Sequence, residues 1–341
     1  MKAALLYGPA DLRVEEVPDR TPGPGEVLVR VTASGVCPSD IRTYTGSASG
    51  SRAPWTPGHE VAGVVAAAGP DVELAEGDGV VLDWRGVCGV CRECRRGAAN
   101  FCAALYKYPI AGFAEYTTMP VTQTRSLPPG LSAEAACFAE PLACVVNAHR
   151  AIPLDHLGDD LLVIGAGPIG LLHTQVARSR GARVIVADTR ADRLETAKQV
   201  GAHDVVEVDG DAGEDIRALT EGRGADAVVV TVGAPAVISS SLGMAARNGT
   251  VNLFAGTHPK GTFELDPDIP HYDQISLTGS HDFAPADFTA ALRLLQFGMV
   301  DTGPLVTHRF GLEDVRAAFE TTRAQTGLKS IIVSRQEGSQ R

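Results

Sequence analysis

The stretch LLVIGAGPIG at residues 161–170 decides the fold of the largest part of this chain. Four apolar residues lead into a glycine-rich turn, and the residues that follow, up to Arg180, have a helical composition. Glycines at this spacing permit a tight turn and a close approach to a pyrophosphate, whose charge is favoured at a helix amino end. In this strand–turn–helix context the pattern predicts a dinucleotide site, although a glycine-rich loop without a ligand is the alternative. The candidate cofactor-binding residues are Gly165, Gly167, Pro168, Ile169 and Gly170.

Apolar runs on both sides of this turn alternate with helix-length segments between about 141 and 280. The runs are Leu161 to Ile164, Arg183 to Ala187, Val205 to Val208, Ala227 to Val232 and Thr250 to Phe254. Continuous apolar runs of this length are typical of strands buried on both faces. The alternation therefore predicts an α/β fold with a doubly wound parallel sheet.

The second of these runs ends in Asp188, about 20 residues beyond the glycine turn. A carboxylate at this place accepts hydrogen bonds from the adenosine ribose and repels a 2′-phosphate. We therefore expect NAD in preference to NADP, with Arg190 and Arg193 close enough to weaken that preference; Arg193 is a further candidate cofactor residue. An aspartate that only caps the next helix is the alternative.

The first 130 residues have a different pattern, in which short β-rich runs are separated by Gly and Pro. These runs are Val27 to Val31, Val61 to Ala66 and Gly79 to Leu82. They predict an irregular, mostly antiparallel β domain.

The end of the chain has two helical stretches and one last apolar run. These are Pro285 to Phe297, Leu312 to Thr322 and Ser330 to Val333. We expect this tail to return to the first domain, so that the α/β part is an insertion.

Four of the seven cysteines lie within residues 88–102, in the pattern C-x2-C-x2-C-x7-C. They are Cys88, Cys91, Cys94 and Cys102. Four thiolates from one short loop form the closed tetrahedral shell of a structural Zn²⁺. An iron–sulfur cluster on the same thiolates is the chemical alternative. A non-catalytic zinc-ribbon scaffold is the rival function, and the nearby Arg92, Arg95 and Arg96 are then an exposed face or a subunit contact.

Composition excludes some classes of protein. The chain has 341 residues and a formal net charge of −11, which argues against a nucleic-acid partner and favours a small-molecule one. Pro9 and Asp11 interrupt the start before a secretory segment forms, and no stretch approaches about 18 uninterrupted apolar residues. We expect a cytoplasmic, globular protein of two domains with no membrane partner.

Two further motifs carry the candidate catalytic chemistry. The sequence GHEVAG at residues 58–63 is followed by Gly69 and Val72, and CPSD at residues 37–40 stands upstream. Together they match the signature of the zinc-containing medium-chain alcohol dehydrogenases. The whole chain resembles this family, with a GroES-like catalytic domain, a four-cysteine lobe and a Rossmann domain in the family's order.

The resemblance implies a catalytic zinc held by Cys37, His59 and a carboxylate. The run EPLAC at residues 140–144 is similar to the polyol branch of sorbitol, butanediol and cyclitol dehydrogenases, in which a glutamate replaces a ligand cysteine. That role is therefore carried over to Glu140, with Cys144 as the alternative; we assign Cys144 and Cys137 to the core.

Glu60 is the other candidate for the carboxylate. Adjacent residues of a strand point to opposite faces, so His59 and Glu60 both reach one metal only if the strand begins or bends there. Pro57 and Gly58 permit this. Glu60 is then either an exchangeable ligand or an outer group that tunes the metal, and the choice between Glu60 and Glu140 stays open.

The resemblance also assigns roles to three residues after Cys37. Ser39 matches the hydroxyl that relays the alcohol proton, with a turn-stabilising serine as the alternative. Asp40 resembles the family's buried acid behind the metal. Tyr44 lines the substrate cleft or packs in the core.

These observations and the resemblance together predict the domain bounds, the reaction and the oligomeric state. Residues 1–142 form the catalytic domain with the zinc lobe at 86–103, residues 143–280 form the Rossmann domain, and residues 281–341 complete the catalytic domain. The expected reaction transfers hydride between NAD and a secondary alcohol of a polyol, cyclitol, aminocyclitol or vicinal diol, with two zinc ions per chain. A dehydrogenase of L-threonine or of a simple alcohol or aldehyde is the alternative, and a homodimer or homotetramer is expected.

Overall fold

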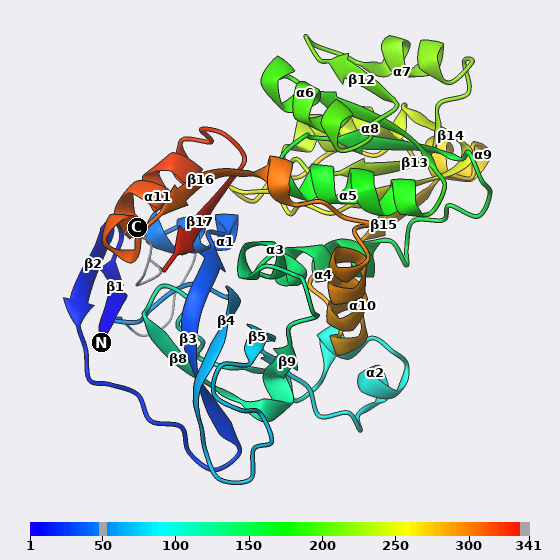
Figure 1. The fold of residues 1–341 in the computed structure, drawn as a ribbon. Helices are drawn as coiled ribbons and strands as arrows, with labels where there is room; N and C mark the ends of the chain where they lie inside the picture. Colours follow the sequence, from blue (N-terminus) through cyan, green and yellow to red (C-terminus); the bar gives the residue numbers. More distant parts are fainter. Residues whose placement is uncertain (48–52, 335–341) are drawn as a thin grey trace. The chain divides into compact units, whose positions relative to one another are not determined.

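The computed structural model describes residues 1–47 and 53–334 (Figure 1). The chain forms two compact units. Unit 1 comprises Met1–Pro141, Ala291–Gln296 and the residues from Val306 onward, and unit 2 comprises Leu142–Ala290 and Phe297–Leu305. Within the described ranges, no helix is long and apolar enough to cross a membrane.

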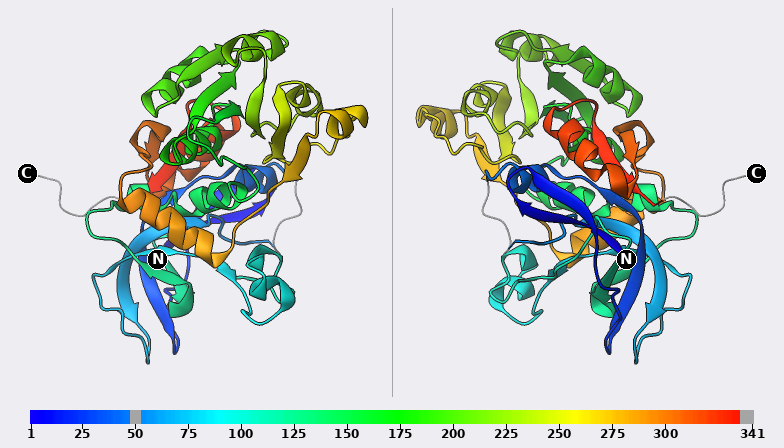
Figure 2. Two further views of the ribbon diagram at one scale, coloured as in Figure 1. Left: turned by 90° about the vertical axis from the view of Figure 1, so that its right-hand side faces the viewer. Right: turned by 90° about the vertical axis from the view of Figure 1, so that its left-hand side faces the viewer.

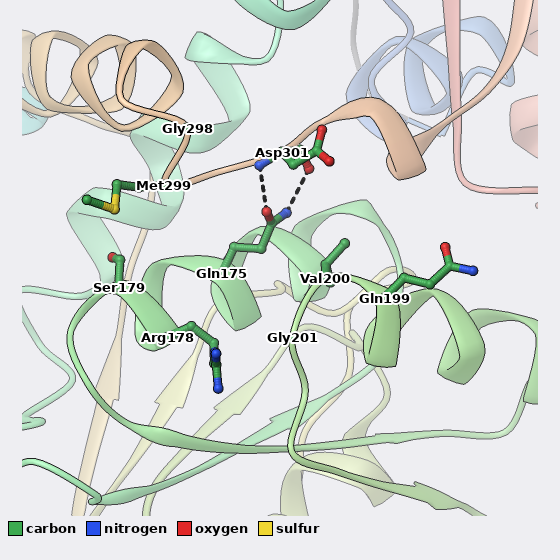
Figure 3. Close-up of a pocket in the computed structure, with 9 residues that line it drawn as sticks. All are labelled: Gln175, Arg178, Ser179, Gln199, Val200, Gly201, Gly298, Met299 and Asp301. Carbon is green, nitrogen blue, oxygen red and sulfur yellow. Dashed lines mark hydrogen bonds between the residues drawn. The ribbon is translucent and has the colours of Figure 1, made fainter.

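The division of the tail differs from the predicted one, because residues 281–290 and 297–305 belong to unit 2. Two polar anchors explain the difference. The buried Asp287 carboxylate accepts a hydrogen bond of 2.5 Å from Arg150. The side chain of Gln175 donates to the backbone carbonyl of Asp301 and accepts from its amide, at 3.0 and 2.6 Å (Figure 3). These bonds tie both segments to unit 2.

Unit 1 is built on a sheet of order β16-β17-β3-β4-β5-β9, with β8 paired to β3. All of its pairings are antiparallel except β16–β17, which confirms the mostly antiparallel β domain. The strands of unit 1 are β1 (Lys2–Gly8), β2 (Asp11–Glu16), β3 (Glu26–Gly35), β4 (Glu60–Ala68), β5 (Gly79–Leu82), β6 (Arg85–Gly86), β7 (Tyr106–Lys107), β8 (Tyr116–Pro120), β9 (Thr124–Ser126), β16 (Val306–Phe310) and β17 (Lys329–Val333). Its helical segments are α1 (Pro38–Tyr44), α2 (Arg92–Arg95), η1 (Ala99–Phe101), η2 (Val121–Gln123), α3 (Ala133–Ala136), η4 (Leu312–Asp314) and α11 (Val315–Arg323).

Side-chain alternation explains why β3 forms. Val27, Val29 and Val31 are buried in one apolar cluster, whereas Arg30 between them is exposed. β4 contributes Val61 and Val65 to the same cluster. This two-residue period is what a strand needs when one face covers a core.

Unit 2 contains a six-stranded parallel sheet of order β12-β11-β10-β13-β14-β15, which confirms the doubly wound Rossmann-type fold. Its strands are β10 (Asp160–Ile164), β11 (Arg183–Asp188), β12 (Asp204–Glu207), β13 (Ala225–Val230), β14 (Ala245–Leu253) and β15 (Ser276–Gly279). Its helical segments are α5 (Pro168–Ser179), α6 (Ala191–Gln199), α7 (Gly213–Leu219), α8 (Pro235–Leu242), α9 (Asp268–Tyr272) and η3 (Gly303–Leu305). Two helices, α4 (Ala139–Ala148) and α10 (Pro285–Gln296), contain residues of both units.

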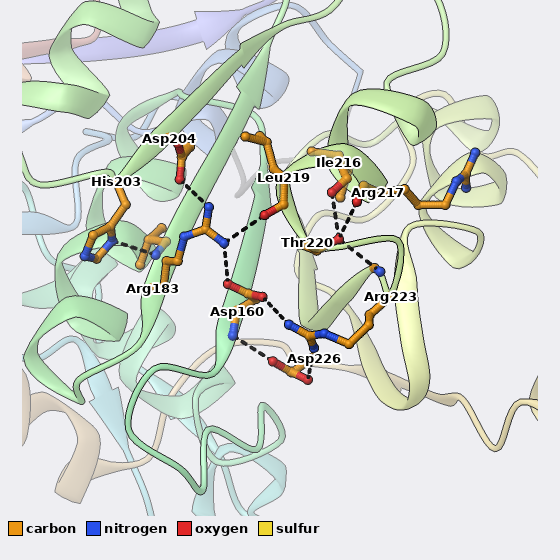
Figure 4. A network of polar contacts seen from close by, with 12 residues as sticks. Asp160, Arg183, His203, Asp204, Ile216, Arg217, Leu219, Thr220, Arg223 and Asp226 are labelled. Atoms are coloured by element: carbon orange, nitrogen blue, oxygen red, sulfur yellow. Dashed lines mark hydrogen bonds and ion pairs between the residues drawn. The ribbon is translucent and has the colours of Figure 1, made fainter.

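The two edges of the parallel sheet have different chemistry. At the amino ends of the strands, Asp160 pairs with Arg183 at 3.0 Å and with Arg223 at 3.2 Å, and Arg183 also reaches Asp204 at 2.7 Å (Figure 4). At the carboxyl ends, the glycine turn of residues 165–170 follows β10. The ion pairs fix the amino edge, and the carboxyl edge is left for a ligand.

The four-cysteine lobe, residues 86–103, forms a loop with the short helix α2 and stands out from the β-strands of unit 1 (Figure 2, cyan). At its base, β6 and β7 pair, with Arg85 opposite Lys107 and Gly86 opposite Tyr106. The lobe is therefore closed at its base by a two-stranded ladder.

Candidate metal centre and dinucleotide site

Cys37 lies immediately before α1, in the helix N-cap position, where it follows the end of β3. Its backbone amide donates a hydrogen bond of 3.0 Å to the Asp40 carboxylate, within a capping box. Asp40 is 3% exposed, and its other carboxylate oxygen lies 3.5 Å from Nδ1 of His59. One buried carboxylate thus positions two candidate metal ligands, as expected for an acid behind a metal.

The turn at Gly58 explains how His59 and Glu60 reach one site. Gly58 has φ of +99°, and a Cβ there would lie 2.9 Å from the Gly112 Cα. β4 begins only at Glu60, so His59 lies before the strand and does not follow the strand's alternation. The ligand atoms of Cys37, His59 and Glu60 all lie within 4.8 Å of one another. We call this group of three candidate ligands the metal cluster.

Glu60 is held by a residue that sequence reasoning missed. The Lys329 ammonium lies 2.7 Å from Oε1 and 2.5 Å from Oε2 of Glu60, and the two side chains are 6% and 1% exposed. Burial alone would lower the pKa of Lys329, but the carboxylate raises it above its usual value. The only signal in the sequence was a lysine that begins an apolar run.

Gly35 makes room for this pair. A Cβ at Gly35 would come within 1.8 Å of the Glu60 carboxylate and 2.9 Å of the Lys329 side chain. Any larger residue would displace the carboxylate, so the glycine at the end of β3 belongs to the site.

Glu140 lies outside this three-residue group. Glu140 lies near the amino end of α4 and is 7% exposed. Its carboxylate accepts a hydrogen bond of 3.1 Å from the indole of Trp84. Burial and the nearby Glu60 raise the pKa of Glu140, while His59 opposes them. The Trp84 ring also lies 5.6 Å from the His59 ring, centroid to centroid. Trp84 therefore connects Glu140 to the metal cluster, and the geometry favours Glu60 as the third ligand.

Neither remaining cysteine joins the cluster. Cys137 is fully buried, its thiol donates to the Glu134 carbonyl, and burial raises its pKa well above the usual range. Cys144 is absent from the ligand groups formed by the described residues. The buried environment of Cys137 agrees with its assignment to the core.

The residues after Cys37 have distinct environments. Ser39 is half-buried at the second position of α1. Tyr44 is buried, donates a hydrogen bond of 2.8 Å to Glu320, and meets the Phe319 ring edge-on at 5.3 Å. Tyr44 is thus a core residue in an apolar cluster.

The donor set at the first site fits zinc. A thiolate, an imidazole and a carboxylate leave the fourth tetrahedral position open, which is the pattern of catalytic zinc. Burial lowers the pKa of His59, but the Asp40 carboxylate and Cys37 raise it well above its usual value. This excess of negative charge around one imidazole is what a cation would neutralise.

The four-cysteine lobe fits a closed zinc shell. Two pairs of sulfurs, Cys88 with Cys94 and Cys91 with Cys102, are each 4.0 Å apart. A tetrahedron with Zn–S bonds of about 2.3 Å has edges of roughly 3.8 Å, so the spacing needs little adjustment. Backbone amides donate to three of the sulfurs at 3.3 to 3.5 Å.

These amides have an electrostatic effect. Backbone donors lower the pKa of the Cys88 thiol to about 6, whereas burial raises that of Cys94 to about 12. One loop thus favours an anionic sulfur before any ion binds.

Each glycine of the dinucleotide turn has a different structural role. Gly165 has φ of +103°, and a Cβ there would lie 2.4 Å from the Thr231 hydroxyl. A Cβ on Gly170 would meet the Gly165 carbonyl at 1.8 Å, so Gly170 allows α5 to pack against the turn. Gly167 caps α5, and a Cβ there would lie 4.0 Å from the Arg193 guanidinium, an ordinary contact distance. Pro168 and Ile169 occupy the first turn of the helix.

Asp188 is fixed beside this turn. One carboxylate oxygen accepts from the Ala166 amide at 2.6 Å and the other from the Arg190 amide at 2.9 Å. Each oxygen retains a lone pair for a ribose hydroxyl. Nε of Arg193 is buried without a hydrogen-bond partner, and burial lowers the pKa of this guanidinium. Arg190, by contrast, pairs with Asp192.

Comparison with known families agrees with this geometry. The family description "Alcohol dehydrogenase GroES-like domain" matches residues 23–129, and "Zinc-binding dehydrogenase" matches residues 168–296. The chain belongs to the zinc-binding alcohol dehydrogenase family. The resemblance inferred from the sequence is therefore confirmed, and a non-catalytic zinc-ribbon scaffold is not supported.

Relatives of this zinc-binding dehydrogenase have more than one name. A sorbitol dehydrogenase of Halalkalibacterium halodurans is 35% identical over 97% of this chain and 99% of its own. An L-threonine 3-dehydrogenase of Pyrococcus horikoshii is 35% identical over 95% of this chain and 94% of its own. A zinc-binding dehydrogenase of Sinorhizobium meliloti 1021, solved with NADP, has a TM-score of 0.89 at 28% identity, covering 97% of this chain and 98% of that one. The chain is thus an alcohol dehydrogenase-type oxidoreductase of small-molecule substrates.

Proposed function

We propose that this enzyme transfers hydride between NAD and a secondary alcohol of a polyol, a cyclitol or aminocyclitol, or a vicinal diol. The observation that carries the proposal is the cluster of Cys37, His59 and Glu60 with Glu140 beside it. Two carboxylates make the site more polar than one built on thiolates. A polyhydroxylated substrate has additional hydroxyls that donate to such groups.

In this proposal Cys37, His59 and Glu60 hold a catalytic zinc, and the four cysteines of the lobe hold a structural one. Bound there, the catalytic ion supplies a Lewis acid that polarises the alcohol oxygen. Asp40 orients Cys37 and His59 through the contacts described above. Ser39 moves the alcohol proton away from the site, and Glu140 accepts a hydrogen bond from a neighbouring hydroxyl.

The cofactor preference is proposed from Asp188 and Arg193. The free lone pairs of Asp188 suit two ribose hydroxyls, and its charge disfavours a 2′-phosphate. Arg193 beside Gly167 suits a phosphate of the cofactor. Because a structural neighbour was solved with NADP, both cofactors belong in the test.

A homodimer or homotetramer is proposed from the edge of the parallel sheet. β15 is the terminal strand of that sheet and pairs with β14. Leu277 on β15 and Tyr272 on α9 are 37% and 73% exposed. An exposed strand edge with apolar side chains favours pairing with a second copy. The cytoplasmic location expected from the sequence stays a prediction.

A substrate panel tests the proposed function. Sugar alcohols, cyclitols, aminocyclitols and vicinal diols are compared with long-chain primary alcohols, with NAD and NADP in parallel, by steady-state formation of NADH or NADPH. We expect the highest kcat/KM with a polyhydroxylated secondary alcohol and NAD. A preference for simple primary alcohols over every polyol contradicts the substrate class.

L-threonine is the second candidate substrate, because a threonine dehydrogenase matches as well as a sorbitol dehydrogenase does. It is also a secondary alcohol, so the same panel with L-threonine separates the two. Turnover of L-threonine above every polyol supports the second candidate.

A further inference from the structure

We propose that Lys107 is a specificity-determining residue that selects substrates with an anionic group, a phosphate monoester or a carboxylate, a few carbons from the reacting alcohol. The inference rests on the proposed function and narrows its substrate class. Lys107 is an exposed cation near Cys37, His59 and Glu60.

Trp84 links Lys107 to the metal cluster. Its indole lies 5.6 Å from the His59 ring and donates to Glu140, and the Lys107 ammonium stands 5.1 Å from its ring centroid. The ammonium is therefore at most about 11 Å from the His59 ring, because the two ring separations set an upper bound. The proposal places a short polyol bound at the metal along Trp84, with its far end toward this charge.

The backbone around Lys107 is fixed. Lys107 lies opposite Arg85 in the β6–β7 ladder, and the next residue, Tyr108, donates its amide to the Trp84 carbonyl at 2.8 Å. The rings of Tyr106 and Tyr108 also meet edge-on at 4.7 Å. This ladder closes the base of the four-cysteine lobe. The lobe thus holds the segment that carries the ammonium.

The charge of Lys107 is available to a ligand. The side chain is exposed, and within residues 1–47 and 53–334 it forms no ion pair with a carboxylate. Its ladder partner Arg85 is also cationic but is 2% exposed, donates to the Asn100 carbonyl and lies 5.7 Å from the same indole. Two cations near one indole, of which one is exposed, favour an anion at this surface and disfavour an amine.

Lysine is also a rare choice in this chain. Only five of the 30 basic residues are lysines, at positions 2, 107, 198, 260 and 329. Two of them, Lys107 and Lys329, lie around the candidate metal cluster. A compact ammonium on a flexible stem suits a phosphate or carboxylate whose position changes during reaction.

The test compares sorbitol, sorbitol 6-phosphate and gluconate as substrates of the zinc-loaded wild-type enzyme and of Lys107→Gln. We expect the wild type to prefer an anionic substrate over sorbitol. Lys107→Gln should lose about tenfold or more in kcat/KM for that substrate, mainly through KM, because one charge-assisted contact is lost. Sorbitol itself should change less than about twofold. The two anionic substrates distinguish a phosphate site from a carboxylate site.

Two variants and one binding measurement serve as controls. Lys107→Arg should restore most of the anionic preference, whereas Lys198→Gln, which removes a lysine from α6, should change nothing. In a Trp55→Phe background Trp84 is the remaining tryptophan, and its fluorescence should change more with sorbitol 6-phosphate or gluconate than with sorbitol, which lacks the group that contacts Lys107. Raising the ionic strength should weaken this response.

Each outcome decides the inference. Equal losses for sorbitol and for the anionic substrates, an unchanged preference in Lys107→Gln, or a preference for amino polyols overturns it, while turnover of sorbitol still supports the proposed function. No reduction of NAD or NADP with any alcohol overturns both.

Discussion

The two candidate metal sites of unit 1 differ in how the chain assembles them. The lobe takes four identical ligands from residues 88–102 and closes around the ion position. The Cys37 site takes three different ligands from a helix cap, a turn and the start of a strand, and its glutamate is held by a lysine 269 residues away in the sequence. A closed structural site is thus a local property of the sequence, whereas an open reactive site depends on the folded domain.

Removal of the Cys37 thiol should produce the largest effect on activity. Cys37→Ala should lower kcat/KM by about a thousandfold or more, because Lewis-acid stabilisation contributes several kcal/mol to the barrier. Zinc content measured by atomic absorption should fall from two ions per chain to one, with the thermal midpoint little changed.

Cys144→Ala is the matched control, since Cys144 lies outside both ligand groups. It should retain two ions and nearly full activity. Equal losses in both variants would remove the distinction between the two cysteines.

Lys329→Met should have the largest effect on stability. It leaves the buried Glu60 carboxylate without its counterion, which costs about 3–5 kcal/mol. Urea unfolding with and without zinc measures this, and zinc should recover part of the loss because it takes over the role of the cation. Lys329→Arg should lose less. If Lys329→Met unfolds like the wild type in the presence of a chelator, the ion pair does not stabilise the site.

Cys94→Ala should destabilise the four-cysteine lobe and have a much smaller effect on the rate of the reaction. We expect one zinc ion per chain and a thermal midpoint lower by more than about 5 °C, because structural zinc contributes folding free energy. At temperatures where the variant is folded, sorbitol oxidation should fall by less than tenfold. A loss of activity as large as that of Cys37→Ala, at unchanged stability, would show that the lobe takes part in the reaction.

The smallest predicted effect lies in unit 2 and involves neither metal site. His149 and His173 form a buried pair with ring nitrogens 3.2 Å apart; burial lowers the pKa of His173 to about 3 and that of His149 well below its usual value. Between pH 6.5 and 3 the unfolded chain therefore binds protons that the folded chain does not, and stability falls as the pH falls.

His173→Gln removes one of these groups. Its loss of stability between pH 7 and pH 5 should be about 2 kcal/mol smaller than that of the wild type, as measured by urea unfolding. The matched control His258→Gln should follow the wild type. An equal acid response in His173→Gln would show that the pair does not titrate in this range.

The sequence predicted most of the fold because its strands are strongly patterned. The glycine turn, the apolar runs within β10 to β14 and the apolar β17 carry direct signals of their conformation. β15 was missed because its four residues are mostly exposed, and such a strand has no apolar pattern. Residues 281–290 and 297–305 of the tail lie in unit 2 and not in unit 1, because polar contacts of Asp287 and Asp301, rather than any pattern in the sequence, tie them there.

The candidate site was predictable as far as its motifs were local. The four cysteines could be named from their spacing, and His59 and Glu60 from the match of residues 58–63 to the family signature. The roles of Lys329 and Trp84 depend on contacts between segments far apart in the sequence. The sequence also left open whether Glu60 or Glu140 approaches the ligands, because only the folded chain shows that Glu60 lies with Cys37 and His59.

The central claim is a zinc ion at Cys37, His59 and Glu60 that the reaction requires. The most direct test is the activity of the purified enzyme with its zinc content measured before chelation, after exhaustive chelation and after zinc is restored. We predict two ions at the start, loss of turnover when the first ion leaves the Cys37 site, and recovery with one added equivalent. Full activity in enzyme that has been shown to contain no metal would contradict the claim.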